Sequence, residues 1–560
     1  MHASAPAPAS SALDRLAPWA WLLLPLACHL GFSWIGFNPT DDGWMQAVAR
    51  RMANGEFPHR DFIFVRPALS AVLQIPLVWL GGDYTIWLSR LWGWLTIGGI
   101  AWLWSGFAQP GRTVWSVRYP LFATAFFLTA HVFPVMAWHS LDGLLLGTAA
   151  VWFAARGTLG GLRAAFVCVG LAALCRQNFA LFGPLLLLAI PDPRKWRTMF
   201  WAALPPLGYL GATLAAGCLP DFLRQVTSPG GALRSVAWQN YLDSPHFLPA
   251  IVLGALAAGI LHRAGSRHAA IAGVMALGVP VLAAGLAAHR LTQGPGPFHA
   301  VAYSFFGLAL GLTLVAAVLR RGLAPADRLP LAAGLALAWV TTVSIGWNSP
   351  ALATGLVLVV IWRVSHLLAQ PLAAAAAPVG RGGALAGLAM LALVSLAFRH
   401  ARQIYPYRDA ATPELTYEVG PVFPGAAGLR TNVRTFAVLQ DLRRQLDQFE
   451  ADGTPYALLT DCAAVWIRSP QANPLPCEWP QITELGYDQR LVDRMTGALR
   501  RLPPNTRILV QRVLISELSY TLAPLGAEWS YYAVQNWVRA HGQRVGQTAY
   551  FEIYAPPTAP

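Results

Sequence analysis

Charge is scarce in this sequence. Asp, Glu, Lys and Arg make up 12% of the 560 residues, about half the proportion found in a typical soluble domain, and the mean hydropathy is +0.45. The shortage is uneven, because residues 1–398 hold 35 of the 66 charged residues and residues 399–560 hold 31. A soluble fold for the whole chain is therefore excluded. We predict a membrane domain for the first part and a soluble domain for the tail.

Lysine is nearly absent, since Lys195 is the only one beside 39 arginines. The net charge of +14 arises almost wholly in residues 1–398, which contribute +13. Basic residues gather in short turns between apolar stretches, as the positive-inside rule expects of cytoplasmic loops. No basic stripe interleaved with aromatic residues lies in the soluble part. The charge therefore indicates membrane topology, and nucleic acid is excluded as a partner.

Apolar stretches of about 20 residues can cross a bilayer, and the sequence predicts thirteen such spans. Residues 67–81 are apolar but short and contain two prolines, so we expect an amphipathic or re-entrant helix in the membrane interface. With the basic turns inside, the N-terminus is predicted in the cytoplasm and the tail on the outer side of a bacterial-type inner membrane. Membrane lipids are therefore predicted partners of the spans. The predicted spans are 17–37, 85–105, 119–138, 141–155, 163–176, 178–190, 198–219, 247–262, 268–288, 299–319, 329–347, 350–369 and 383–398.

The predicted fold is thus an α-helical polytopic membrane protein with a small α/β extracytoplasmic domain. Residues 1–16 form a cytoplasmic lead, residues 17–398 the membrane domain with a first outer loop at 38–84, and residues 399–560 the tail. Apolar periodicity in the tail alternates between helical and strand patterns. The patterns predict helices over 441–453 and 489–502 and strands over 456–461, 507–513 and 550–555.

Six cysteines fall into two groups. Four lie in apolar runs and are interpreted as small hydrophobic residues. Cys462 and Cys477 flank a proline-containing loop in the tail. If the tail faces an oxidising compartment, these two could form a disulfide that holds the loop.

The first outer loop carries the densest group of charged residues. Asp41 and Asp42 follow the first span directly, a helix is expected over 43–54, and Glu56, His59, Arg60, Asp61 and Arg66 come next. Acids at a membrane boundary are costly unless they are paired, hydrated or used. One interpretation is a salt-bridged loop in which the two acids pair with Arg50 or Arg51. The other is a catalytic site.

The loop resembles the first outer loop of the GT-C glycosyltransferases. The resemblance rests on the Asp41–Asp42 pair, a short helix with small residues, the G-x-x-P at 55–58, and Arg66–Pro67. This superfamily uses polyprenyl-phosphate sugars and includes protein O-mannosyltransferases, lipid A aminoarabinose transferases and bacterial family-39-like enzymes. The sequence departs from the pattern at Asp42, Met45 and Ala68, where Glu, Tyr and a second Pro are usual.

Three further motifs resemble the same superfamily. GGDYTIWLSRLWGWL places Arg90 at the start of the second span, WHSLDGLLLG places Asp142 at the outer start of the fourth, and LCRQNFALFGPLLLL places Arg176 before an apolar run. Arg176 has a second interpretation, in which it only pairs with Asp142 or binds backbone carbonyls. The resemblance implies a GT-C-like fold and transfer of a sugar from a polyprenyl-phosphate donor to an extracytoplasmic acceptor.

Such a transfer needs a base for the acceptor hydroxyl and a cation for the departing phosphate. Arginine suits the second role because its planar fork binds phosphate oxygens in pairs and keeps its charge. The candidate base is Asp41, with Asp42 as helper and Asp61 as a further catalytic candidate. The candidate substrate-binding residues are Arg66, Arg90, His139, Asp142, Arg176, Gln177 and Arg290.

No H-x-x-x-H or H-E-x-x-H spacing occurs, so we predict no metal site or cofactor, with a divalent cation left as an open alternative. Two other functions stay open. A transporter or flippase for lipid-linked substrates commonly shows internal repeats and charges at mid-span, whereas the acids here gather at one face. An O-antigen ligase or polymerase usually carries its key loop late in the chain.

Overall fold

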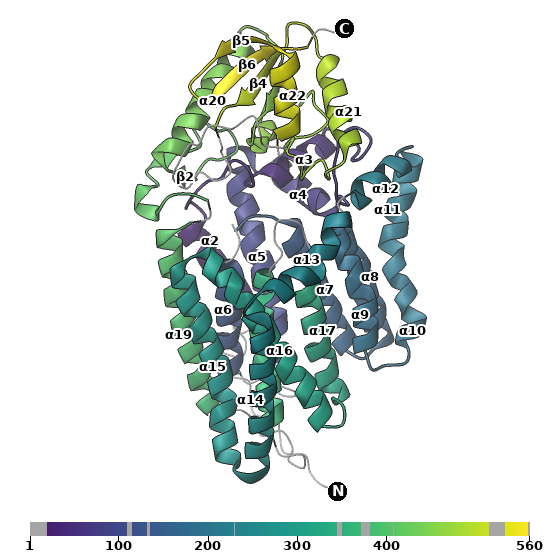
Figure 1. Cartoon of the computed structure of the whole chain (residues 1–560), viewed down its shortest axis with the longest axis vertical. Helices are drawn as coiled ribbons and strands as arrows, with labels where there is room; N and C mark the ends of the chain where they lie inside the picture. The colour runs from purple at the N-terminus through teal and green to yellow at the C-terminus, as the bar shows by residue number, and fades with distance from the viewer. Residues whose placement is uncertain are drawn as a thin grey trace.

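Helices dominate the first part of the chain and a small sheet forms the tail. The computed structural model describes residues 19–108, 115–131, 135–228, 230–343, 350–370, 381–406, 408–513 and 532–557. The long helices run side by side along the long axis of the molecule, and the tail caps one end of this bundle (Figure 1). The predicted lead over residues 1–16 lies outside the described residues.

Each of the thirteen predicted spans contains a helix. Among the described residues five helical stretches are long and apolar enough to cross a membrane, and α2, α4, α8 and α9 are shorter apolar helices. The helical membrane-type architecture is confirmed, and the number of spans stays a prediction. The helices at the predicted spans are α2 (Ala20–Phe32), α5 (Thr85–Ser105), α6 (Trp115–His131), α7 (His139–Ala155), α8 (Leu159–Cys175), η3 (Gln177–Leu181) with α9 (Phe182–Ala189), η4 (Met199–Ala203) with α11 (Leu204–Ala215), α14 (Phe247–Arg267), α15 (Ala269–Gln293), α16 (Pro295–Leu319), α17 (Pro325–Thr342), η5 (Pro350–Ala353) with α18 (Thr354–Ala369), and α19 (Arg381–Ile404).

Shorter helices occupy the ends of the bundle. The predicted helix over 43–54 is confirmed as α3, and the apolar stretch 67–81 contains α4, which lies beside α3 under the tail (Figure 1). The interfacial position of α4 stays a prediction. The bounds of these elements are α3 (Trp44–Ala53), α4 (Leu69–Leu80), η2 (Gly82–Tyr84), α10 (Lys195–Thr198), α12 (Leu219–Thr227) and α13 (Gly230–Asp243).

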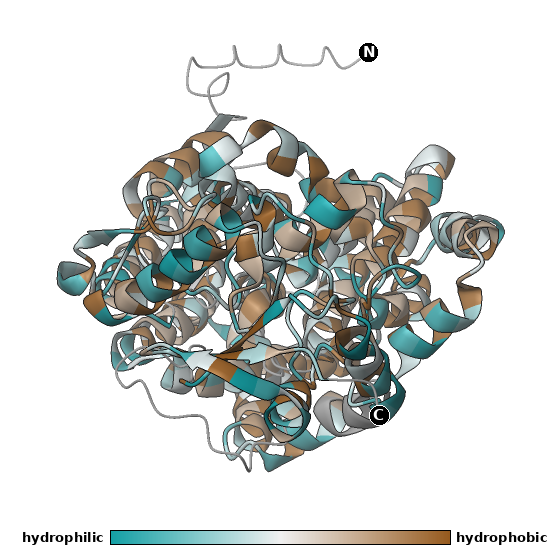
Figure 2. Cartoon of the chain, turned by 90° about the horizontal axis from the view of Figure 1, so that it is seen from above, coloured by the Kyte–Doolittle hydropathy of each residue, from teal (hydrophilic) through white to brown (hydrophobic). Residues whose placement is uncertain are grey.

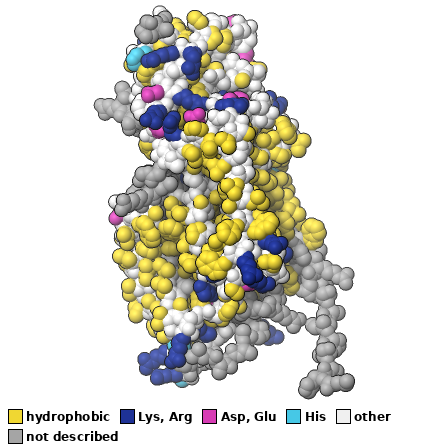
Figure 3. Space-filling model, turned by 90° about the vertical axis from the view of Figure 1, so that its right-hand side faces the viewer, with side chains coloured by type: hydrophobic (Ala, Val, Ile, Leu, Met, Phe, Trp, Pro, Cys, Tyr) yellow, Lys and Arg dark blue, Asp and Glu magenta, His cyan; other side chains and the backbone are white. Residues whose placement is uncertain are grey.

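The distribution of side chains matches a protein that crosses a bilayer. Hydrophobic residues occur on helices around the whole outline of the bundle (Figure 2). On the face shown in Figure 3, hydrophobic side chains cover the middle, acidic and basic side chains mix near the tail, and Lys and Arg predominate toward the other end. This is the asymmetry that the positive-inside rule expects.

The tail is a four-stranded sheet between helices. The strand order is β3-β4-β6-β5, in which β3 pairs parallel to β4 and the other two pairings are antiparallel. The predicted helices at 441–453 and 489–502 and all three predicted strands are present, whereas β5 and α22 were not predicted. The elements are η6 (Thr412–Glu414), β1 (Tyr417–Glu418), β2 (Arg430–Thr431), α20 (Val433–Ala451), β3 (Tyr456–Leu459), η7 (Ala463–Ile467), α21 (Gln489–Arg500), β4 (Arg507–Gln511), α22 (Ala533–His541), β5 (Gln543–Gln547) and β6 (Phe551–Ala555).

Alternate residues of β3 enter two different hydrophobic clusters. Tyr456 and Leu458 pack with α20, whereas Ala457 and Leu459 pack with α21 and α22. Because successive strand residues point to opposite faces, α20 covers one face of the sheet and α21 with α22 covers the other. The tail is therefore a three-layer α/β/α unit, which confirms the α/β fold predicted for it.

The first outer loop, together with Phe37 and Ile86 that flank it, is built into the same two clusters. Phe37, Ala47 and Ile86 pack in the α20 cluster, and Ile63 and Val65 pack in the α21 cluster. Backbone hydrogen bonds join the two segments, including Ile63 N to the Pro476 carbonyl at 2.6 Å and Ile86 N to the Gly425 carbonyl at 3.0 Å. The tail and the loop thus share their hydrophobic cores.

The predicted disulfide between Cys462 and Cys477 is wrong for this structure. Both cysteines are buried and free. Cys462 packs in the α20 cluster and Cys477 in the α21 cluster, so the two side chains have different neighbours. Burial also raises the pKa of each thiol, which disfavours the thiolate that disulfide exchange requires.

Candidate functional site

Asp41 and Asp42 lie in a tight turn that ends where α3 begins. The Asn38 side chain accepts hydrogen bonds from the amides of Thr40 and Asp41 at 3.1 and 3.4 Å, and the Asn38 amide donates to Oδ2 of Asp42 at 3.0 Å. Gly43 follows at φ +81°, and a β-carbon there would meet a tail side chain at 2.5 Å. The turn therefore fixes two buried carboxylates, 7% and 3% exposed, beneath the tail.

Asp42 is paired with Arg90. Nη2 of Arg90 donates to Oδ2 of Asp42 at 2.9 Å and to the Gly36 carbonyl at 2.6 Å. Nη1 donates to the carbonyls of Ser33 and Ile35 at 2.7 and 3.1 Å. The guanidinium of Arg90 thus holds the segment after α2 against Asp42, and the substrate-binding role predicted for Arg90 stays a prediction.

Asp41 faces the segment that connects α19 to the tail. Nη1 of Arg408 donates to Oδ2 of Asp41 at 2.8 Å, and the Arg408 side chain is 38% exposed. Arg408 has φ +49°, and the next residue, Asp409, is buried and accepts hydrogen bonds from the Phe37 amide and from Thr431 and Asn432 side chains. Asp409 thus joins the loop to the tail and holds Arg408 next to the candidate base.

The alternative in which Asp41 or Asp42 pairs with Arg51 is not supported, and a pairing with Arg50 stays a prediction. Arg51 instead donates to Glu56 at 2.5 and 2.7 Å and to Glu478 of the tail at 2.8 Å. The reason is the direction of α3, which carries Arg51 to the far end of the helix, toward the loop that precedes α21.

A second polar cluster forms around Arg66. Its Nη1 and Nη2 donate to the two carboxylate oxygens of Glu484 at 2.5 and 2.8 Å. The Arg66 guanidinium lies 4.9 Å from the centre of the Trp44 ring, a cation–π contact. Trp44 is the first residue of α3, three positions after Asp41, so the aromatic ring links the two clusters.

Arg176 and His139 lie beside Arg66. Nη1 of Arg176 donates to the Ser140 hydroxyl at 2.6 Å, and Arg176 interacts electrostatically with Arg66. His139 is 1% exposed, and neither ring nitrogen has a hydrogen-bond partner. Its ring packs 4.7 Å from that of Trp138 and is close enough to both arginines to feel their charge. Three of the predicted substrate-binding residues therefore come together.

Asp142 and Gln177 lie at the edge of this cluster. Trp92 Nε1 donates to Oδ1 of Asp142 at 2.9 Å, and Oδ2 of Asp142 has no hydrogen-bond partner within the described residues. A pairing of Arg176 with Asp142 is therefore not supported. Gln177 donates to the carbonyls of Val65 and Val226 and has a buried Oε1 with no partner. Gln177 thereby ties the start of η3 to the strand-like segment before Arg66.

Two predicted site residues lie elsewhere. Asp61 is paired with Arg60 and accepts from the Phe57 amide at 2.6 Å, and these hydrogen bonds, first of all that from Arg60, lower the pKa of its carboxyl. A carboxylate stabilised in this way is a poor base. Arg290 donates to Gln293 at 3.0 Å near the end of α15. No contact described here brings Asp61 or Arg290 to the Arg66 cluster.

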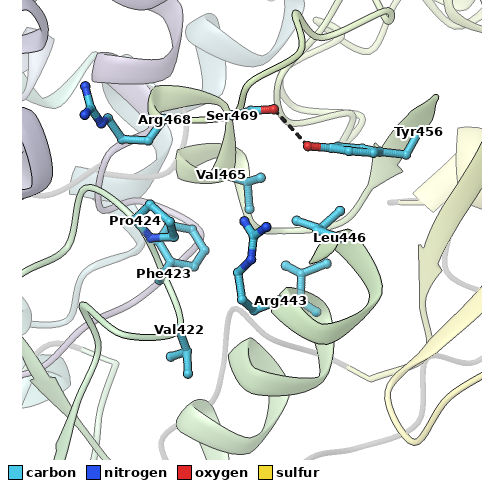
Figure 4. Close-up of a pocket in the computed structure, with 10 residues that line it drawn as sticks. Val422, Phe423, Pro424, Arg443, Leu446, Tyr456, Val465, Arg468 and Ser469 are labelled. Carbon is cyan, nitrogen blue, oxygen red and sulfur yellow. Dashed lines mark hydrogen bonds between the residues drawn. The ribbon is translucent and has the colours of Figure 1, made fainter. Parts of the chain in front are cut away.

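A separate pocket lies in the tail, between α20, β3 and η7 (Figure 4). Phe423, Leu446 and Val465 line it, and its polar groups are engaged by the protein. Tyr456 donates to Glu450 and contacts the Ser469 hydroxyl at 2.9 Å, and Arg443 pairs with Glu450 at 2.6 Å. This pocket shares no lining residue with the two polar clusters.

Among the described residues no group of three or more His, Cys, Asp and Glu side chains could hold a metal ion. The partners supplied by the tail, Glu484 and Arg408, were not predicted from the sequence. They lie 418 and 367 positions from Arg66 and Asp41, and a single sequence carries no signal for a contact over such separations.

The fold was compared with known proteins. Two crystal structures of ArnT from Cupriavidus metallidurans are similar to this chain. In the structure bound to undecaprenyl phosphate the identity is 14%, the TM-score is 0.37, and the match covers 98% of this chain and 100% of ArnT. The apo structure gives the same identity and TM-score over 97% of this chain and 100% of ArnT. No protein-family model matches the sequence, and no curated protein matches it.

Proposed function

We propose that this protein is an integral membrane glycosyltransferase. It moves a sugar from a polyprenyl-phosphate donor to the hydroxyl of an extracytoplasmic acceptor, which is a lipid, a glycan or a protein. The observation that carries the proposal is the buried cluster of Arg66, Arg176 and His139 beside the Asp41 turn. Two arginines and an unpartnered buried imidazole offer several N–H donors to one anion.

The cluster suits the phosphate end of a lipid-linked sugar. It lies at the boundary between the apolar bundle and the tail, where a donor can leave its polyprenyl chain in the membrane while its sugar faces outward. Buried polar groups without partners are costly, so the free nitrogens of His139 and the free Oε1 of Gln177 favour a ligand or water at this place.

In the proposed reaction the acceptor oxygen forms a bond to the anomeric carbon of the donor sugar. The bond from that carbon to the phosphate oxygen breaks, and polyprenyl phosphate leaves with the electron pair. Asp41 takes the proton of the acceptor hydroxyl. Arg66 and Arg176 stabilise the negative charge of the departing phosphate. Asp42 and Arg90 hold the turn that carries Asp41.

The test is binding of undecaprenyl phosphate to the full-length protein in lipid nanodiscs, measured by native mass spectrometry. Arg176→Ala should weaken binding about 10- to 100-fold, because a hydrogen bond to a charged group contributes about 1.5–3 kcal/mol. Arg176→Lys keeps the positive charge but lacks the planar guanidinium, so its affinity should lie between those of the unmodified protein and Arg176→Ala. Arg224→Ala removes an exposed arginine of an outer segment and serves as the matched control.

Unchanged binding in a folded Arg176→Ala protein would contradict the phosphate assignment. The transfer reaction itself is tested by mass spectrometry of envelope lipids and glycans from a deletion strain beside its parent. Loss of one glycan modification in the deletion strain supports the transferase. Accumulation of an unmodified lipid-linked donor on the cytoplasmic side would favour a flippase instead.

A further inference from the structure

The carboxylate of Glu484, a residue of the tail, forms an ion pair with the guanidinium of Arg66. The contact uses both nitrogens and both oxygens, at 2.5 and 2.8 Å, and the two side chains are only 12% and 9% exposed. Carboxylate and phosphate present the same paired oxygen geometry to arginine. The position that a phosphate would take on Arg66 is therefore filled by a group of this chain.

The carboxylate is also the counter-charge that lets the cluster exist without a ligand. A buried ion pair that loses one partner leaves an uncompensated charge, which is strongly destabilising. The Arg66 side chain is largely buried, so it needs an anion when no ligand is bound, and Glu484 supplies it.

The backbone around Glu484 is held in place. The preceding Gln481 donates to the buried carboxylate of Asp461 at 2.6 Å, and the following Leu485 is fully buried in the α21 cluster. Gly486 has φ +62°, and a β-carbon there would lie 2.1 Å from the Ser228 hydroxyl. The tail is thus built to present this side chain to Arg66, and an exchange of anions needs only rotation of the Glu484 side chain.

We propose that Glu484 is a built-in competitor of phosphate for Arg66. The inference rests on the proposed function. A lipid-linked phosphate displaces the carboxylate because its polyprenyl chain contributes additional binding in the membrane. Inorganic phosphate lacks that contribution and displaces the carboxylate only at higher concentration. Glu484 therefore sets the affinity that a phosphate must reach before it occupies Arg66.

The experiment measures undecaprenyl phosphate binding to the full-length protein in nanodiscs, with inorganic phosphate as competitor. Glu484→Gln keeps a hydrogen-bond acceptor but removes the charge. We take Glu484 to be paired with Arg66 in about nine-tenths of the ligand-free molecules. Loss of this pairing should then tighten binding about tenfold, because the apparent Kd scales inversely with the fraction of molecules able to bind. Inorganic phosphate should compete in Glu484→Gln at about tenfold lower concentration than in the unmodified protein.

Glu484→Asp distinguishes two effects of Glu484, its direct pairing with Arg66 and the repulsion of a bound phosphate by its negative charge. Aspartate keeps the charge but is one methylene too short for the paired contact, so it should also tighten binding. The matched control is Glu478→Gln, which removes a buried carboxylate from Arg51 in the same loop and should leave the affinity unchanged.

Four results would overturn the inference. Weaker binding in Glu484→Gln would show that Glu484 stabilises the binding site. Tighter binding in Glu484→Gln but not in Glu484→Asp would show that only the negative charge of Glu484 matters, and not its pairing with Arg66. Arg176-dependent binding that neither variant changes would remove this inference alone. Absence of any Arg176-dependent binding would remove the donor assignment and this inference with it.

Discussion

Arg408 and Asp41 form an ion pair of 2.8 Å between the start of the first outer loop and the segment that leads into the tail. The carboxylate is buried, whereas the guanidinium is 38% exposed. The pair is therefore accessible to solvent from the Arg408 side. Asp42, one residue away, points instead to the buried Arg90, so the two neighbouring acids have different surroundings.

The first prediction follows from that difference. Asp41→Asn keeps the size of the side chain and removes the base, and transfer should fall about 10²–10⁴-fold with expression and donor binding retained. Asp42→Asn should mainly destabilise the fold, by about 3–5 kcal/mol, because it leaves Arg90 buried without its partner. Transfer assays and thermal unfolding of both variants, purified in detergent, measure the two effects.

The double variant Asp41→Asn/Asp42→Asn controls for substitution of one carboxylate by the other. Full transfer activity in a folded double variant would remove this turn from the mechanism. Reduced stability of Asp41→Asn with unchanged activity per folded molecule would show that the ion pair of Asp41 with Arg408 stabilises the fold and takes no part in transfer.

The second prediction concerns pH. His59 is buried, contacts the Tyr209 hydroxyl at 2.8 Å and the Gln225 side chain at 3.2 Å, and burial lowers its pKa from 6.5 to about 4. Between these values the unfolded chain binds a proton that the folded chain does not, so stability is complete above about pH 6.5 and is lost as pH falls toward 4. The loss is on the order of 3 kcal/mol for this shift.

Thermal unfolding at several pH values checks it. His59→Asn tolerates the positive φ of this position and removes the titrating group, so its stability should depend less steeply on pH between 6.5 and 4. Equal slopes for the two proteins would show that His59 does not contribute to the acid sensitivity.

The third prediction is that Cys462 and Cys477 stay unmodified in the native protein. Both thiols are buried and belong to different clusters, so a maleimide should react with them only after denaturation. Mass spectrometry of protein purified without reductant should find two free thiols, and a linked peptide pair containing both cysteines would contradict the structure.

The fourth prediction is the orientation in the membrane. Glu414 is exposed in the tail and Arg267 is exposed at the end of α14. With the tail outside, a membrane-impermeant maleimide should label Glu414→Cys in intact cells and label Arg267→Cys only after permeabilisation. The reverse pattern would contradict the orientation derived from the basic turns.

The sequence predicted features that depend on neighbours along the chain. Helix α3, the helices at the thirteen spans and the strands β3, β4 and β6 all follow from local apolar periodicity. The sheet order and the partners of Arg66 and Asp41 depend on contacts across hundreds of residues, and local patterns carry no information about them. Arg90 illustrates this limit, because the sequence motif located it at the start of a span but did not indicate that it donates to Asp42 and to backbone carbonyls after α2.

The shared cores of the first outer loop and the tail bear on how the chain is made. Phe37, Ala47, Ile63, Val65 and Ile86 are synthesised early, yet their packing partners lie in the last third of the polypeptide. During translation these side chains stay exposed until the tail emerges, a state that invites aggregation or chaperone binding. A ribosome that stops before the tail therefore releases a chain in which the turn that holds Asp41 and Asp42 lacks its packing partners.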